Sequence, residues 1–392
     1  MEKTDLVRLW VADCFILKEE GVKMEITVES CLHTLVGRSL MQNAGNEKYT
    51  LNDLVHNFAL YMREKEYVST DQLNSELVSH HARYVSSVGG RCSSETLRGQ
   101  ENLRGLMCRE VDCLFTFNFV YIRLLRVLDL QWDKFSKLSE SIGDLMLLKY
   151  INLLGARIFE LPESITRLRE LQTLIPCYSK VKRLPNKISA LGSLRHLDIH
   201  GTELLEFLPS EIGMLTYLQT LSKFVVGSCR TMDGSMKSSL SELRELNCLI
   251  ENLRIEHLER VGSIEETDHA ELKRKKSLHG LHLSCDSKYV IEFNKAVIEK
   301  VERVYERMEP PRAVECFSID GYPGKKFSTW ISSFTYSCLR KINIRDCKFL
   351  TNLPNLEFLP NLKDLIISCV DMIKVFDTTY DHVCGKVAFP KL

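Results

Sequence analysis

The sequence predicts an α/β solenoid of stacked parallel strands, preceded by a small helical domain. Three observations predict this fold class. A leucine pattern returns at a nearly constant step, a second apolar pattern keeps the same step, and the start of the chain shows helical spacing instead. Self-similarity of this kind is typical of repeat architectures, in which each unit buries its apolar face only against its neighbours.

The first pattern has the form Leu-x-x-Leu-x-Leu, in full or shortened by its last residue. It begins at residues 125, 148, 171, 194 and 218, so the steps are 23, 23, 23 and 24 residues. Such a segment forms a short strand whose alternate apolar side chains point into the core. The length and form of this pattern identify leucine-rich repeats, which stack into a solenoid with curved parallel strands on the concave side.

The second pattern is an apolar pair four residues apart, as in Leu161-Pro-Glu-Ser-Ile165. It recurs at 138–142, 184–188 and 208–212, and we expect it to return the chain along an irregular convex side. A tight corner is expected eight residues after the first leucine of each repeat. Small or polar residues stand at this position: Asp133, Ala156, Ser179, Thr202 and Cys347.

Beyond residue 222 the rhythm loosens, but apolar alternation still predicts strands at 250–255, 278–283, 314–319, 339–344 and 362–367. The segments at about 223–245 and 284–312 are expected to be loops or convex-side helices. The last residues, 389–392, look like the start of another repeat. A solenoid needs a polar terminal cap, so the sequence predicts a truncated C-terminus.

The first 66 residues have no 23-residue step. Apolar spacing predicts helices at 5–18, 28–41 and 53–63, with a turn at 43–46 and a short strand at 49–51. Two helices, a hairpin-like wing and a further helix suggest a winged-helix domain. We therefore expect a winged-helix domain at 1–66, truncated at its N-terminus, a linker with irregular first repeats at 67–120, and the solenoid at 121–392.

Composition excludes several classes of function. Lys+Arg and Asp+Glu both total 52, which argues against a large phosphate footprint on nucleic acid. A DNA-reading helix at 28–41 would offer only Arg38. No apolar stretch reaches the roughly 18 residues of a membrane span. No nucleophile, base and orienter come together in the sequence, so we do not expect an enzyme.

The 14 cysteines include no Cys-x-x-Cys pair, which favours free thiols in a reducing cytoplasm over a disulfide framework. Cys14 and Cys31 are expected to be buried structural thiols. His196 and His200 share one face of a predicted strand, but no third ligand stands at a sensible spacing. We therefore expect no metal.

Three segments of the N-terminal part resemble one family. Residues 6–16 are similar to its "LIxLWxAEGFI", residues 35–42 to its "LVxRSLLQ", and residues 49–59 to its "YxMHDLVHDLA". The repeats resemble it as well, for instance at 194–199 and 321–330. This family is the plant nucleotide-binding leucine-rich-repeat (NLR) disease-resistance proteins. The matches occur in the family's order and cover most of the chain.

The resemblance implies a fragment of an intracellular immune receptor without the nucleotide-binding domain. It would recognise a pathogen effector or a guarded host protein, or contact other receptor domains intramolecularly. A leucine-rich-repeat adaptor or scaffold without a switch is the alternative. No G-x-x-x-x-G-K-[ST] loop occurs, so we expect no cofactor in this chain, and ADP or ATP only in a full-length parent.

The family's MHD motif contains a histidine that contacts the phosphate of ADP. The matching residues here are Leu51, Asn52 and Asp53, which makes Asn52 and Asp53 the candidate cofactor-binding residues. Asn52 can donate a hydrogen bond but cannot become cationic.

The concave strand face is the predicted protein-binding surface, because solenoids present such rows to their partners. We expect these strand residues to be exposed there: Tyr150, Asn152, His196, Asp198, His200, Lys341, Asn343 and Arg345.

Overall fold

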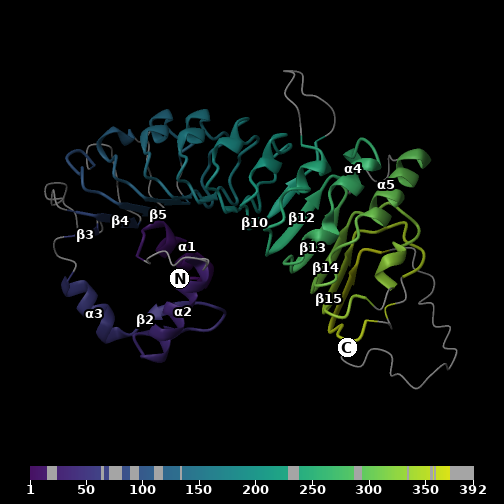
Figure 1. Cartoon of the computed structure of the whole chain (residues 1–392), viewed down its shortest axis with the longest axis horizontal. Helices are drawn as coiled ribbons and strands as arrows, with labels where there is room; N and C mark the ends of the chain where they lie inside the picture. Colours follow the sequence, from purple (N-terminus) through teal and green to yellow (C-terminus); the bar gives the residue numbers. More distant parts are fainter. Residues whose placement is uncertain are drawn as a thin grey trace. The chain divides into compact units, whose positions relative to one another are not determined.

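The computed structural model describes residues 1–15, 24–62, 66–69, 82–88, 97–109, 118–132, 135–227, 238–286, 294–332, 335–353, 356 and 359–370. The chain divides into two compact units (Figure 1). The first unit contains Met1–Pro185, Ala190–His196 and Gly201–Leu204, and the second contains Asn186–Ser189, Leu197–His200 and Leu205–Leu392.

The first unit begins with three helices and a hairpin. Their bounds are α1 (Lys3–Ala12), α2 (Met24–Gly37), β1 (Met41–Asn43), β2 (Tyr49–Leu51) and α3 (Asp53–Met62). β1 and β2 pair antiparallel, as the predicted wing requires. Leu6 of α1, Leu32 of α2 and Met41 of β1 form one core cluster. α1 stops earlier than predicted, because Cys14 adopts a left-handed φ of 60°; Lys18, the predicted end, lies outside the described residues.

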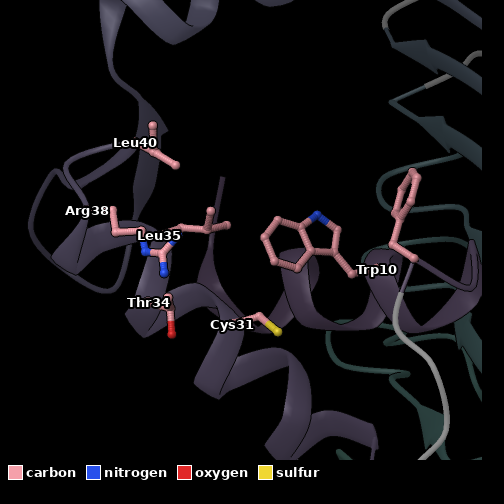
Figure 2. A pocket seen from close by; sticks show the side chains of 7 residues that line it. Trp10, Cys31, Thr34, Leu35, Arg38 and Leu40 are labelled. Carbon is pink, nitrogen blue, oxygen red and sulfur yellow. The ribbon is translucent and has the colours of Figure 1, made fainter.

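An apolar pocket of about 530 Å³ opens where α1 and α2 meet (Figure 2). Its lining comes from the end of α1, from α2 and from the turn after α2: Trp10, Phe15, Cys31, Thr34, Leu35, Arg38 and Leu40. Trp10 is partly buried and packs against both clusters that join α1 to α2.

The strand ladder of the first unit starts at residue 67, inside the segment predicted as a linker with irregular first repeats. Its strands are β3 (Tyr67–Ser69), β4 (Tyr84–Val88), β5 (Gly105–Arg109), β6 (Val127–Gln131), β7 (Tyr150–Asn152) and β8 (Thr173–Ile175). Each pairs parallel with the next. The turns between them include η3 (Phe119–Tyr121), η4 (Glu140–Asp144) and η5 (Glu163–Arg167), and the second apolar pattern lies at η4 and η5.

After β8 the chain forms a short turn and two short strands: η6 (Ile188–Ala190), β9 (His196–Leu197) and β10 (Thr220–Leu221). The second unit continues with η7 (Ile212–Met214), β11 (Lys223–Val225), η8 (Leu240–Leu243), β12 (Asn252–Glu256), η9 (Leu258–Arg260), α4 (Glu265–His269), η10 (Leu272–Arg274), β13 (Gly280–Ser284), α5 (Lys295–Arg307), β14 (Cys316–Asp320), η12 (Thr329–Ser332), β15 (Lys341–Arg345) and β16 (Asp364–Ser368). β11 to β16 pair parallel in chain order. α5 occupies the insertion at 284–312, one of the two predicted alternatives.

The corner of the repeat lies one residue earlier than predicted. Eight residues, each seven positions after the start of a repeat, adopt φ between 52° and 69°: Trp132, Gly155, Tyr178 and Gly201 in the first unit, and His257, Gly321, Asp346 and Cys369 in the second. The small residues that follow, such as Ala156 and Thr202, are buried. They are small because they enter the core, and the preceding residue makes the turn; Asp133 lies outside the described residues.

Candidate protein-binding faces

In the first unit, the strand side chains opposite the leucine core form rows across neighbouring strands. Tyr150 is in register with Val127, and Asn152 with Asp129. The exposed fractions of Tyr150, Asn152 and His196 are only 1%, 3% and 8%. The prediction that these three residues are exposed is therefore wrong.

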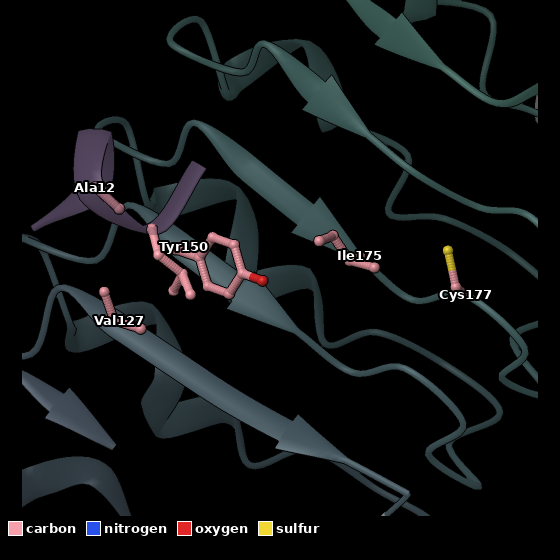
Figure 3. Packing of buried hydrophobic residues seen from close by; sticks show 6 residues of the cluster. Ala12, Val127, Tyr150, Ile175 and Cys177 are labelled. Carbon is pink, nitrogen blue, oxygen red and sulfur yellow. The ribbon is translucent and has the colours of Figure 1, made fainter. Parts of the chain in front are cut away.

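Helix α1 covers this face (Figure 3). Leu9 and Ala12 pack in one buried cluster with side chains of β6, β7, β8 and the residues after β8: Val127, Tyr150, Ile175 and Cys177. The sequence does contain a signal that α1 covers this face. Val127 and Ile175 are apolar at strand positions that would face water in an uncovered solenoid.

Polar contacts fasten the same junction. The Tyr84 hydroxyl donates to the Asp13 carboxylate at the end of α1. Arg126 donates to the Asp13 carbonyl at 3.2 Å. Gly105 makes the first contact possible, because a Cβ there would lie 2.7 Å from the Tyr84 ring. Sequence reasoning missed all of these residues, since the partners lie up to 113 residues apart.

An ion pair joins α2 to the repeats. Arg195 Nη1 lies 2.9 Å from Glu25 Oε1, and His196 Nε2 lies 4.0 Å from the same oxygen. Burial, with the guanidinium groups of Arg8 and Arg195 nearby, lowers the pKa of His196 to about 3. His196 is therefore a neutral residue of the junction at physiological pH.

Burial also shifts the pKa of Asp129, the acidic residue beneath α1. It raises the pKa of Asp129 to about 6, although Arg109, 3.7 Å away, acts in the opposite direction. Asp129 is 1% exposed. Burial on the covered face thus shifts the pKa values of His196 and Asp129, and an open strand face in contact with water would not cause these shifts.

The strand face of the second unit is different, because its rows are polar. One row crosses five strands in register: Arg254, His282, Ser318, Asn343 and Ile366. The neighbouring inward positions, such as Leu281 and Ile342, are buried. Lys341 and Arg345, both predicted partner-binding residues, are exposed on this face and Asn343 is partly buried.

Three atoms of this row are buried without a hydrogen-bond partner among the described residues: Arg254 Nε, His282 Nε2 and Asn343 Oδ1. Arg254 Nε still has an ion-pair partner, because it lies 2.8 Å from Glu256 Oε1. Burial, together with Arg254 and Arg345, lowers the pKa of His282 to about 3, so the imidazole is neutral. An unsatisfied buried polar group costs about 1–3 kcal/mol. A ligand that supplies the missing partners would therefore gain affinity at this point of the row.

Asp198 and His200 belong to the second unit and lie two residues apart in the chain. Asp198 Oδ1 accepts a hydrogen bond from the His200 amide at 3.2 Å. Asp198 is partly buried and His200 is exposed. The predicted histidine pair is thus divided, with buried His196 in the first unit and exposed His200 in the second.

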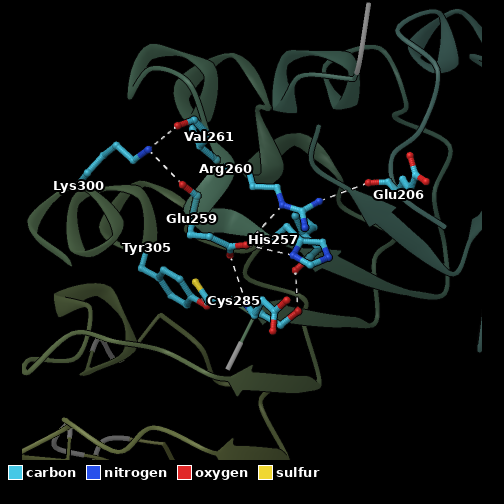
Figure 4. Close-up of polar contacts among 11 residues, drawn as sticks. Glu206, His257, Glu259, Arg260, Val261, Cys285, Lys300 and Tyr305 are labelled. Carbon is cyan, nitrogen blue, oxygen red and sulfur yellow. Dashed lines mark hydrogen bonds and ion pairs between the residues drawn. The ribbon is translucent and has the colours of Figure 1, made fainter. Parts of the chain in front are cut away.

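A polar network holds the turn that follows β12 (Figure 4). Burial tends to raise the pKa of Glu259, but the hydrogen bond from His257 and its other bonds leave it lowered. Lys300 of α5 donates to the carbonyls of Glu259 and Val261 at 3.1 and 2.8 Å. These contacts fix α5 to the neighbouring repeat.

The predicted nucleotide-contacting residues have a structural role here. Asn52 Oδ1 accepts a hydrogen bond from the Leu54 amide at 2.9 Å, and Asp53 is the first residue of α3. Asn52 therefore caps the helix, as asparagine often does. A contact of Asn52 and Asp53 with a nucleotide in a longer protein stays a prediction.

Among the described residues, no three His, Cys, Asp or Glu side chains gather in an arrangement that could hold a metal ion. None of the described helices has the length and hydropathy that crossing a membrane requires.

Two family models match the chain. Residues 1–59 match the disease resistance protein winged helix domain, and residues 240–370 match the R13L1/DRL21 leucine-rich repeats. An internalin (InlF) from Listeria monocytogenes has a similar fold, with a TM-score of 0.51 at 11% identity, over 81% of this chain and 82% of the internalin. The predicted fold class, a leucine-rich-repeat solenoid with a winged-helix domain, is confirmed.

The similar proteins are also named as disease resistance proteins. Disease resistance protein RGA2 of Solanum bulbocastanum is 30% identical over 100% of this chain and 38% of its own length. Putative disease resistance RPP13-like protein 1 of Arabidopsis thaliana is 30% identical over 94% of this chain and 36% of its own. The chain thus spans about a third of the length of these relatives. By its winged-helix segment and its repeats, the chain belongs to the leucine-rich-repeat (NLR) disease-resistance family.

Proposed function

We propose that this chain acts in an intracellular immune receptor and recognises a protein ligand through the strand face of its second unit. The observation that carries the proposal is the pair of unsatisfied buried atoms, His282 Nε2 and Asn343 Oδ1, on one row of that face. Ser318 stands between them in register. The ligand class is a pathogen effector or a guarded host protein, and the compartment is the cytoplasm.

The ligand that fits this row is a folded protein or an extended segment that offers both donors and acceptors. Arg254 is engaged with Glu256 at 2.8 Å and Asp320 at 3.7 Å, so the row carries internally balanced charge. Hydrogen bonding, rather than net charge, would then select the partner. The exposed side chains of Lys341 and Arg345 would add contacts to acidic residues of the partner around it.

For the first unit we propose an intramolecular partner. The packing of α1 on Val127, Tyr150 and Ile175 already occupies the face that a ligand would use. Tyr150, Asn152 and His196 would then act in restraining the winged-helix domain, and an external ligand would reach them only after α1 leaves.

A photo-cross-linking residue at Ser318 tests the proposal in leaf cells. We expect it to capture a protein ligand in pathogen-challenged tissue, and we expect the double change His282→Ala and Asn343→Ala to reduce the yield roughly tenfold or more. The matched control places the cross-linker at Glu299 of α5, whose side chain is 52% exposed. Capture from Glu299 but not from Ser318 would contradict the proposed face.

The adaptor or scaffold alternative predicts a different result in the same experiment. A scaffold would hold the same partner from Ser318 in challenged and unchallenged tissue alike. A recognition receptor would gain its partner on challenge only, so the comparison of the two tissues separates the alternatives.

A further inference from the structure

The end of α1 places a thiol and an amine against each other across the junction of the first unit. Cys14 follows the helix, and its Sγ lies 3.0 Å from Nζ of Lys149, the residue just before β7. Both side chains meet at the exposed edge of the junction, and Cys14 is exposed rather than buried as predicted from sequence. The two residues are 135 positions apart in the chain.

Both backbones are held, so the fold keeps the two side chains within reach of each other. The Cys14 amide donates to the Val11 carbonyl at 3.3 Å. The preceding residue, Asp13, is bonded to both Tyr84 and Arg126. The Lys149 amide donates to the Arg126 carbonyl at 2.9 Å. A nucleophile and an electrophile held this way react as an intramolecular pair.

We propose that Cys14 and Lys149 form a reversible, oxidant-driven cross-link that binds the winged-helix domain to the repeats. The oxidant is hydrogen peroxide, which reaches the exposed thiol. Cys14 loses its proton and the thiolate attacks one peroxide oxygen; an S–O bond forms, the O–O bond breaks, and the other oxygen leaves as hydroxide, which takes up the thiol's proton to become water. The product is a sulfenic acid.

The neighbouring amine completes the reaction. In its unprotonated form, Lys149 Nζ attacks the sulfur of Cys14; an S–N bond forms, the S–O bond breaks, and the hydroxyl leaves with a proton from the amine as water. One thiol, one amine and one peroxide thus give one sulfenamide and two waters. The sulfur is oxidised by two electrons and the peroxide is reduced by two. One small thiol attacks the sulfur and forms a mixed disulfide with Cys14, with the amine as leaving group. A second small thiol then releases the free Cys14 thiol and leaves as a disulfide with the first.

The cross-link would change the junction without changing its contacts. Leu9 and Ala12 already pack on the strand face, and a covalent bond at residue 14 prevents α1 from leaving it. We expect hydrogen exchange of the α1 amides to slow roughly tenfold or more on oxidation, because closing so long a loop restricts the opened state. Reduction would restore the original exchange rate.

Peroxide treatment of the whole chain followed by peptide mapping tests the proposal. The expected product is a peptide that joins Cys14 to Lys149, lighter than its two parts by two hydrogen atoms and lost on reduction. Its yield is expected to rise with pH, since only the unprotonated amine attacks.

The control variant is Lys149→Arg, which keeps the positive charge but has no comparable nucleophile. In this variant, dimedone is expected to label the Cys14 sulfenic acid, which escapes labelling in the unaltered chain. Exposed Cys248, Cys338 and Cys369 should be labelled equally in both proteins. Equal labelling of Cys14 in the two proteins, with no joined peptide, would overturn the proposal. The mapping of the unaltered chain decides the matter even if the variant folds poorly.

Discussion

Asp129 shows how a covering helix changes the chemistry of one strand residue. Its carboxylate lies beneath α1, and burial raises its pKa to about 6. A carboxyl group that binds its proton more tightly in the folded than in the unfolded state makes folding more favourable as the pH falls. The charged form of Asp129 therefore lowers the free energy of unfolding at neutral pH. This residue lies where the repeats meet the winged-helix domain.

We expect Asp129→Asn to increase the free energy of unfolding at pH 7 by up to about 3 kcal/mol, since the shift is about two pKa units. In the unaltered chain, the unfolding free energy should rise relative to the variant as the pH falls from about 6 towards 4. Urea unfolding at several pH values measures both effects.

The matched control for Asp129 is Asp144→Asn. Asp144 also has an arginine at 3.7 Å, Arg167, but its side chain is 54% exposed. Its replacement should change stability by less than about 0.5 kcal/mol at every pH. A loss of stability in Asp129→Asn at neutral pH would mean that the Arg109 pair outweighs burial.

At the scale of the repeat, the left-handed residue is the feature that the turns share. In the first unit, aromatic and glycine residues alternate at this position, so that each ring lies on the next glycine. A Cβ on Gly155 would lie 2.2 Å from the Trp132 ring, and a Cβ on Gly201 would lie 2.4 Å from the Tyr178 ring. The glycines are therefore required twice, for their φ and for the space above them.

We expect Gly155→Ala to lower the free energy of unfolding by about 1–3 kcal/mol from backbone strain, with a further loss from the displaced Trp132 ring. Thermal unfolding measures the change. Gly192→Ala is the matched control, because a Cβ there meets nothing within 4 Å. If both variants melt at the same temperature, the ring and glycine alternation has no energetic role.

A second prediction belongs to the junction between β4, β5 and α1. Gly105→Ala places a methyl group against the Tyr84 ring and moves the hydroxyl that donates to Asp13. We expect faster hydrogen exchange at the end of α1, while the amides of β7 keep their protection. Tyr84→Phe, which removes the hydroxyl and keeps the ring, should reproduce the effect. Unchanged exchange in both variants would show that this bond does not hold α1.

The strands were predictable from sequence because their signal is local. The alternation that buries Leu128 and Leu130 of β6 is readable within six residues, and the outward strand positions Lys341 and Asn343 were found in the same way. The cover on Tyr150 was not predictable from its repeat alone. It depends on Leu9 and Ala12, more than a hundred residues away, and a single sequence does not show which distant segments meet. Cys14 was expected to be buried because the sequence predicted a helix that continues past it, whereas α1 ends at Ala12.

At the scale of the whole chain, the two units share parallel strands but differ in the side chains at their outward strand positions. The first unit offers apolar side chains such as Val127 and Ile175 and has them covered by its own helix. The second unit offers the polar row with His282 and Asn343, whose free hydrogen-bonding atoms suit an external partner. Under the proposed function, the composition of the outward strand positions would distinguish a face for intramolecular contact from a face for recognition.

We expect that α1 and α2 can leave the strand face of the first unit while the repeats stay folded. Glu25 and Arg195 form a partly buried pair that joins segments 170 residues apart. We expect Glu25→Lys to turn this attraction into repulsion and cost about 1–2 kcal/mol at the junction, so that α1 and α2 leave the strand face more often. Hydroxyl-radical footprinting should then label Tyr150, which is protected in the unaltered chain. Tyr305, fully buried in the second unit, should stay protected. Labelling of both tyrosines together would indicate general unfolding instead, and the face beneath α1 would then be part of a permanent core rather than a surface that can open.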